Sequence, residues 1–85
     1  MKALVLINAP AKHSGGLVDE LKVFPEVFEA CAVWGETDVY AMVEVESEEH
    51  LDDLVMRQIQ GLEQVTSTRT YILIGSYLYK KAGED

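Results

Sequence analysis

The 85-residue chain is long enough for one domain with a single modest core. Its formal net charge of −8, from 15 acidic and 7 basic residues, argues against direct binding to nucleic acid or to an anionic membrane surface. The apolar fraction of 48% is typical of globular proteins and argues against disorder.

Two features of the sequence bear on the cellular compartment. Cys31 is the only cysteine, so no disulfide can form within the chain, and a reducing compartment fits best. The opening residues MKALVLINAP contain an apolar run too short for a signal peptide, and no stretch approaches the roughly 20 apolar residues of a membrane-spanning helix. We therefore expect a cytoplasmic protein.

The chain opens with a predicted strand and a predicted helix. Residues 2–8, KALVLIN, are aliphatic and β-branched and precede a loop-like segment, which predicts a buried strand. Residues 14–24 place their apolar side chains on one helical face, with Ser14 as the candidate N-cap. Pro25 ends this helix because proline disfavours a helical residue before it.

Two strands follow, joined by the segment Gly-Glu-Thr-Asp. Residues 26–35 alternate, and one side is formed by Phe28, Ala30, Ala32 and Trp34. Residues 38–46 alternate more clearly, and the side predicted to face the core is formed by Val39, Ala41, Val43 and Val45. Tyr40 and Met42 lie on the other side of this strand, which is therefore too apolar to be a simple solvent face.

The second half of the chain contains another helix and another strand. Residues 47–60 carry an apolar stripe at helical spacing, with Ser47 as the candidate N-cap and Gly61 as the candidate C-terminal cap. Residues 64–75 are rich in threonine and isoleucine, which predicts a fourth strand. The residues after it are expected to extend this strand briefly before fraying.

The predicted order of elements, β-α-β-β-α-β, is that of a ferredoxin-like α/β plait, an α+β fold. Both helices then cover one face of an antiparallel sheet. The opposite face carries the apolar side chains of Phe28, Trp34, Tyr40, Met42 and Tyr71. Because such a set should not face water, we expect a second subunit to pack against it sheet to sheet, forming a homodimer.

The segment between the second and third strands is wider than a two-residue turn. Gly35 can adopt a positive φ, and without a side chain it lets backbone N–H groups approach a small anion such as an α-carboxylate. Asp38 can accept from an α-ammonium group or from the backbone of its own turn. Thr68 and Thr70 offer hydroxyl groups on one side of the last strand, whereas Arg69 points to the other. The residues alone leave turn chemistry and ligand binding both open.

The segments EVFEACAVWGETDVYAMVEVES and QGLEQVTSTRTYILI closely resemble the ligand-sensing RAM domain of the Lrp/AsnC (leucine-responsive, feast/famine) transcription regulators. The resemblance covers about residues 2–75, and its most specific parts are the Gly-x-x-Asp loop between two strands and the TRTY of the last strand. It implies that an amino acid or similar effector binds between dimers near that loop, and that dimers assemble into rings, often octamers. The candidate ligand-binding residues are Gly35, Glu36, Thr37, Asp38, Tyr40, Thr68 and Thr70.

The sequence departs from the regulators of this family in one respect. A predicted strand begins at Lys2, so we expect a single domain over residues 1–85 without a DNA-reading helix-turn-helix. The resemblance then implies a stand-alone, non-enzymatic sensor that modulates its own assembly or that of full-length Lrp/AsnC regulators. The alternative is a small dimeric α/β-barrel enzyme on the same plait.

No catalytic, metal or cofactor site is predicted. His13 lies in a loop and His50 on a charged helix face, without a third ligand at metal spacing. Cys31 lies between alanines in a predicted strand and is expected to be a buried apolar residue. No set of residues combines a nucleophile, a base and an orienting group.

Overall fold

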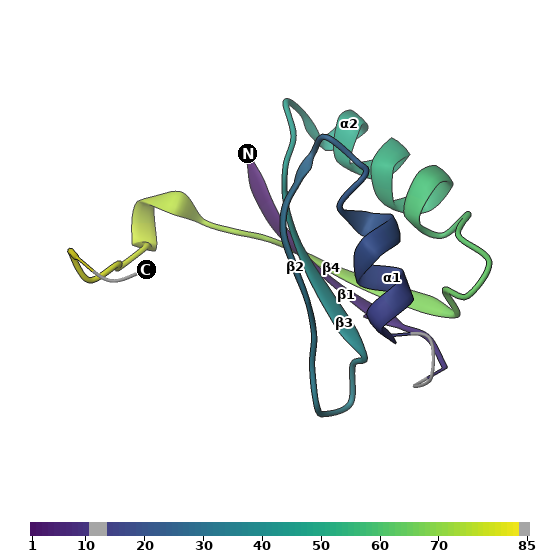
Figure 1. The fold of residues 1–85 in the computed structure, drawn as a ribbon. Helices are drawn as coiled ribbons and strands as arrows, with labels where there is room; N and C mark the ends of the chain where they lie inside the picture. The colour runs from purple at the N-terminus through teal and green to yellow at the C-terminus, as the bar shows by residue number, and fades with distance from the viewer. Residues whose placement is uncertain (11–13, 84–85) are drawn as a thin grey trace.

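The structure, a computed structural model, describes residues 1–10 and 14–83, and His13 lies outside them. Its elements in chain order are β1 (Lys2–Asn8), α1 (Ser14–Leu21), β2 (Val27–Ala32), β3 (Val39–Glu44), α2 (Glu48–Asp52), η2 (Asp53–Ile59), β4 (Ser67–Ile72) and η3 (Gly75–Tyr77). The four strands form one antiparallel sheet in the order β2-β3-β1-β4, with α1 and the α2–η2 helix on one face (Figure 1). This architecture confirms the predicted ferredoxin-like plait.

The hydrophobic core lies between the sheet and the helices, and alternation along the central strands decides which side chains enter it. β1 contributes Ala3, Val5 and Ile7, whose partners on β3 are Val43, Ala41 and Val39. The helices contribute Leu17, Leu21, Leu51, Leu54, Val55 and Ile59. All of these residues are buried, as is Val45, so the predicted core side of residues 38–46 is confirmed. Burying one valine, leucine or isoleucine side chain contributes about 1.5–3 kcal/mol to the stability of the fold.

The first helix differs from the prediction at both ends. Ser14 is the first residue of α1 rather than its N-cap, and the helix ends at Leu21, before the predicted end at residue 24. The N–H of Phe24 donates to the carbonyl of Leu21 at 3.1 Å, so a turn already closes the helix ahead of Pro25.

The second helix begins as predicted and ends differently. The hydroxyl of Ser47 accepts from the N–H of His50 at 3.1 Å, which confirms the N-cap. From Asp53 the helix is wound as a π-helix, and Gly61, just after it, does not adopt a positive φ. A Cβ at Gly61 would lie 2.6 Å from the carbonyl oxygen of Arg57, so close packing, not a left-handed cap, favours glycine there.

A β-bulge in β2 changes which of its residues face the helices. The register shifts between Val27 and Glu29 and leaves Phe28 as the extra residue. Ala30 packs against the core, whereas the ring of Phe28 lies under the Lys2 ammonium, 5.3 Å from its centroid, on the side away from the helices. The expectation that Phe28 and Ala30 share one side is therefore wrong.

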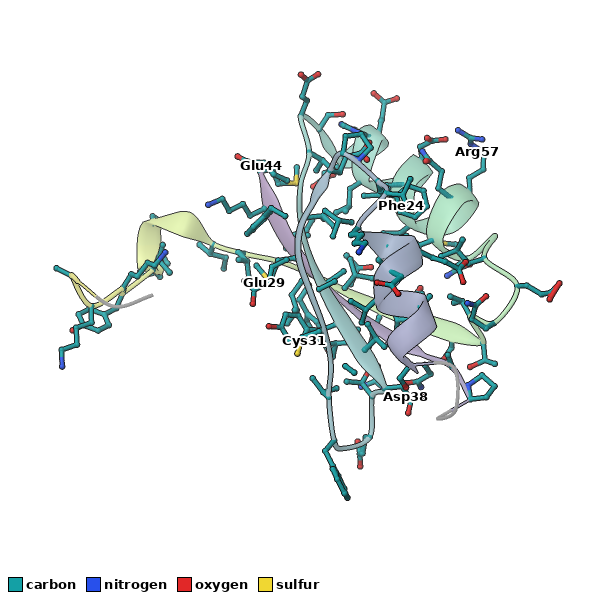
Figure 2. All side chains as sticks on the ribbon, viewed as in Figure 1. Phe24, Glu29, Cys31, Asp38, Glu44 and Arg57 are labelled. Carbon is teal, nitrogen blue, oxygen red and sulfur yellow. The ribbon has the colours of Figure 1, made fainter. Side chains whose placement is uncertain are left out.

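The sheet face away from the helices, here called the open face, carries many large apolar side chains in this single chain. They include Leu4, Leu6, Phe28, Tyr40, Met42 and Tyr71. Cys31 pairs with Tyr40 and is exposed on this face, because the bulge reverses the alternation that predicted it to be buried. Figure 2 shows Cys31 and Glu29 on the side of the sheet opposite α1.

Candidate functional site

The loop of residues 33–38 joins β2 to β3 and is tied to the end of β1. The N–H of Asp38 donates to the carbonyl of Ile7 at 3.1 Å, and the hydroxyl of Thr37 donates to the same oxygen at 3.2 Å. The carboxylate of Asp38 accepts from the N–H of Ala9 at 2.8 Å. The side chain of Asp38 therefore fixes the loop to a distant part of the chain, whereas its carbonyl closes the loop itself by accepting from the N–H of Val33 at 2.9 Å.

A polar cavity of about 360 Å³ lies on the open face between this loop and β4. It is lined by Leu6, Asn8, Glu36, Thr37, Ser67, Thr68 and Arg69. The amide of Asn8 donates to the hydroxyl of Ser67 at 3.2 Å and links β1 to β4 within the lining. Glu36 and Arg69 bring opposite charges to the same cavity, and no ion pair in the described part of the chain involves either of them.

An apolar hollow of about 440 Å³ adjoins the polar cavity. It is lined by Leu4, Leu6, Val33, Trp34, Gly35, Thr37 and Tyr40, so the two share Leu6 and Thr37. Trp34, in the loop, is fully exposed. The hydroxyl of Tyr40 donates to the carboxylate of Glu29, and this hydrogen bond raises the pKa of Tyr40 above its ordinary value.

The structure distributes the seven predicted ligand-binding residues over several places. The polar cavity is lined by Glu36, Thr37 and Thr68, and the apolar hollow by Gly35, Thr37 and Tyr40. The linings of these two cavities include neither Asp38 nor Thr70. Five of the seven candidate residues thus line one or both of the adjoining cavities, and Asp38 and Thr70 line neither.

Two of the chemical roles expected from the sequence take a different form. Gly35 does not adopt a positive φ, and a Cβ added there would meet nothing within 4 Å. The hydroxyl of Thr68 accepts from the side-chain amide of Gln60 at 2.7 Å, on the helix-covered side. Thr70 pairs with Val5, whose side chain is in the core, so its side chain also lies on the helix-covered side of the sheet.

Sequence reasoning did not propose Asn8, Trp34, Ser67 or Arg69 for the site. Alternation along the last strand did place Arg69 opposite Thr68, and the structure confirms that placement through its pairing with Leu6. What was missing was the strand order, since only the position of β4 beside β1 brings Arg69 towards the loop.

A second polar cluster lies at the other end of the sheet, where the segment before β2 meets the start of α2. The ring Nε2 of His50 lies 2.7 Å from the carboxylate of Glu26, and Nδ1 accepts from the N–H of Glu46 at 3.2 Å. Nε2 therefore carries the proton and donates to Glu26. This bond lowers the pKa of the Glu26 carboxyl below its ordinary value, although burial opposes the change. The cluster joins two segments of the fold.

Across residues 1–10 and 14–83, no three His, Cys, Asp or Glu side chains gather closely enough to hold a metal ion. Within the same residues, no helix has the length and apolar character needed to cross a membrane.

Several solved structures share the fold of this chain. TTHA0845 from Thermus thermophilus is 31% identical, with a TM-score of 0.82, and the match covers 94% of this chain and 98% of that one. AsnC from E. coli is 22% identical with a TM-score of 0.85, over 94% of this chain and 54% of the regulator. The Neisseria meningitidis transcriptional regulator NMB0573, solved in complex with L-Met, is 15% identical with a TM-score of 0.78, over 92% and 52%. At these identities the two regulators show a common fold.

Sequence comparison identifies the family. No curated protein matches the chain. The family model of the Lrp/AsnC ligand binding domain, however, matches residues 2–82. Because this match spans nearly the whole sequence, the chain belongs to the Lrp/AsnC ligand-binding domain family.

Proposed function

We propose that this protein is a non-enzymatic sensor of a free amino acid or a similar zwitterionic effector. The observation that carries the proposal is the polar cavity, where Glu36 and Arg69 offer opposite charges. A guanidinium group can hold a carboxylate through two parallel hydrogen bonds, and a carboxylate accepts readily from an ammonium group. An α-amino acid carries both complementary charges on one carbon atom, so it matches this pair.

The adjoining apolar hollow supports an effector with an apolar side chain. It meets the polar cavity at Leu6 and Thr37, so a ligand held by its charged groups can extend its side chain past Gly35 and Tyr40. The Neisseria meningitidis regulator that shares this fold is a complex with L-Met, which is such an amino acid. In this proposal Asp38 contributes by holding the loop in place.

Regulation follows from assembly. The open face pairs two copies sheet to sheet, and dimers associate further into a ring such as an octamer, with the effector near the dimer–dimer contact. An effector bound there stabilises whichever assembly completes its site, by its differential affinity for the two states. The net charge of −8 favours action through protein partners, including full-length regulators of the family, over direct contact with nucleic acid.

The test is thermal unfolding with a panel of amino acids, combined with native mass spectrometry for oligomer size. An effector at about 100 times its Kd raises the free energy of unfolding by about 2.7 kcal/mol. In a domain of this size that corresponds to a rise in Tm of about 10 °C or more. If no amino acid changes either Tm or oligomer size, the proposal is wrong.

Single substitutions test whether the effector binds in the polar cavity. Arg69→Ala should weaken effector binding roughly 10- to 100-fold, because it removes a charge-assisted contact worth about 1.5–3 kcal/mol. Arg57→Ala is the matched control, since Arg57 is the only other arginine and pairs with Asp53 at 2.6 Å on the η2 segment. Equal responses of the two variants would contradict the assignment of the polar cavity.

A further inference from the structure

The chain beyond β4 leaves the body of the domain. The N–H of Leu73 donates to the carbonyl of Lys2 at 3.0 Å. Beyond it, the backbone hydrogen bonds found in the described residues are local and close the short helix η3. Figure 1 shows this segment, in yellow-green, extending away from both the sheet and the helices. Residues 74–81 are called the arm below.

The arm carries large apolar side chains that its own domain leaves uncovered. They are Ile74, Tyr77, Leu78 and Tyr79, which are 67%, 86%, 71% and 82% exposed. Holding such a segment extended in water costs conformational entropy and gains no contacts in return. A contiguous apolar surface of this kind usually marks a contact with another molecule.

We propose that the arm of one copy packs across the open face of a second copy, and that the exchange is reciprocal. The open face offers matching apolar surface, with Phe28 51% and Tyr71 47% exposed. Tyr71 and Leu73 connect this surface to the base of the arm along the chain. In a twofold dimer each copy then supplies one arm and receives one.

Charge favours a second copy as the occupant. The arm ends in Lys80 and Lys81, both exposed, within a chain whose net charge is −8. Glu29 and Glu44 are exposed on β2 and β3, and Figure 2 shows both on the side of the sheet away from α1. Lys2 and Arg69 also lie on the open face, so the complementarity is local, between the lysines of the arm tip and the carboxylates of Glu29 and Glu44. Charged side chains at the edge of an interface mainly set the orientation in which the two copies meet.

The inference rests on the sheet-to-sheet pairing of the proposed function but not on the effector, so a failed amino-acid titration leaves its test unaffected. The first test measures the dimer dissociation constant by analytical ultracentrifugation. Tyr77→Ser combined with Leu78→Ser should raise it by about tenfold or more, as expected for buried interface anchors. Val23→Ser is the control, because Val23 is 76% exposed but lies outside the arm and the open face. Wild-type dimerisation by the arm variant would overturn the proposal.

A second measurement uses the folded full chain and asks whose face the arm contacts. A photo-crosslinking phenylalanine analogue replaces Tyr79 in a mixture of unlabelled and nitrogen-15-labelled protein, and the cross-linked peptides are identified by mass spectrometry. Cross-links that join the arm of one isotopic form to residues 26–44 of the other are the expected result. Cross-links confined to one isotopic form, or directed to the helices, would overturn the proposal.

Discussion

Replacing Asp38 with alanine separates a structural role of this residue from a ligand-binding role. The Asp38 carboxylate accepts from the N–H of Ala9 at 2.8 Å, and Ala9 is only 6% exposed. Alanine removes a hydrogen bond to a charged group and leaves a buried backbone donor without its partner. Such a loss costs about 1.5–3 kcal/mol. For a domain of this size, the corresponding fall in Tm is roughly 6–24 °C.

The assay is thermal unfolding without effector, followed by far-ultraviolet circular dichroism. Fluorescence is less suitable because Trp34, the single tryptophan, is already exposed in the folded chain. Protein concentration is held constant because association changes the apparent stability. Asp38→Asn retains an acceptor oxygen and should recover about half of the loss, since neutral hydrogen bonds contribute about 0.5–1.5 kcal/mol. Glu36→Ala, in the same loop but exposed, should change the free energy of unfolding by less than about 0.5 kcal/mol.

One result would refute this reasoning. If Asp38→Ala unfolds at the wild-type temperature but no longer responds to amino acids, the bond to Ala9 contributes little to stability. Asp38 would then act on the effector directly, as the resemblance to the Lrp/AsnC family first suggested.

Two further predictions concern packing and pH. Gly61→Ala should lower the free energy of unfolding by about 1–3 kcal/mol in a urea titration, because the new Cβ would lie 2.6 Å from the Arg57 carbonyl oxygen. Gly35→Ala is the control and should change the free energy of unfolding by less than about 0.5 kcal/mol, because a Cβ there meets nothing within 4 Å. Equal effects of the two substitutions would contradict the packing argument. The hydrogen bond from His50 that lowers the pKa of Glu26 stabilises the fold at pH values above the ordinary pKa of 4.5. This contribution to stability is lost as the pH falls through the folded-state pKa of Glu26. Below about pH 4.5, wild-type urea midpoints should therefore fall more steeply than those of His50→Ala, and parallel profiles would show that His50 does not set this pKa.

The parts of the fold that the sequence predicted are those governed by short-range periodicity. The alternation from Val39 to Val45 was sufficient to assign the buried side of β3, because successive residues of a regular strand face opposite sides. Ser47 was recognisable as an N-cap because its partner is three residues away. The bulge at Phe28 depends on pairing with another strand. For that reason the alternation placed Ala30 on the same side as Phe28 and Cys31 in the core, and both placements were wrong.

The candidate site depended more strongly on long-range structure. Asp38 looked like a turn or ligand residue, yet its partner Ala9 lies 29 positions earlier in the sequence. Arg69 was assigned to the correct side of its strand, but only the sheet order brings it into a cavity with Glu36. Tertiary placement, rather than residue type, is what separates the cavity-lining residues from the others.

The central position of β1 has a consequence for how this chain is made. β1 is synthesised first, yet it lies between β3 and β4, so both of its edges lack partners until those later segments have emerged from the ribosome. Its sequence, KALVLIN, is short, aliphatic and carries a single charge. Segments of that composition with unpaired edges pair readily with other chains during synthesis. In the finished sheet β3 and β4 cover both edges of β1, so the exposure of this strand is greatest before those later segments have folded.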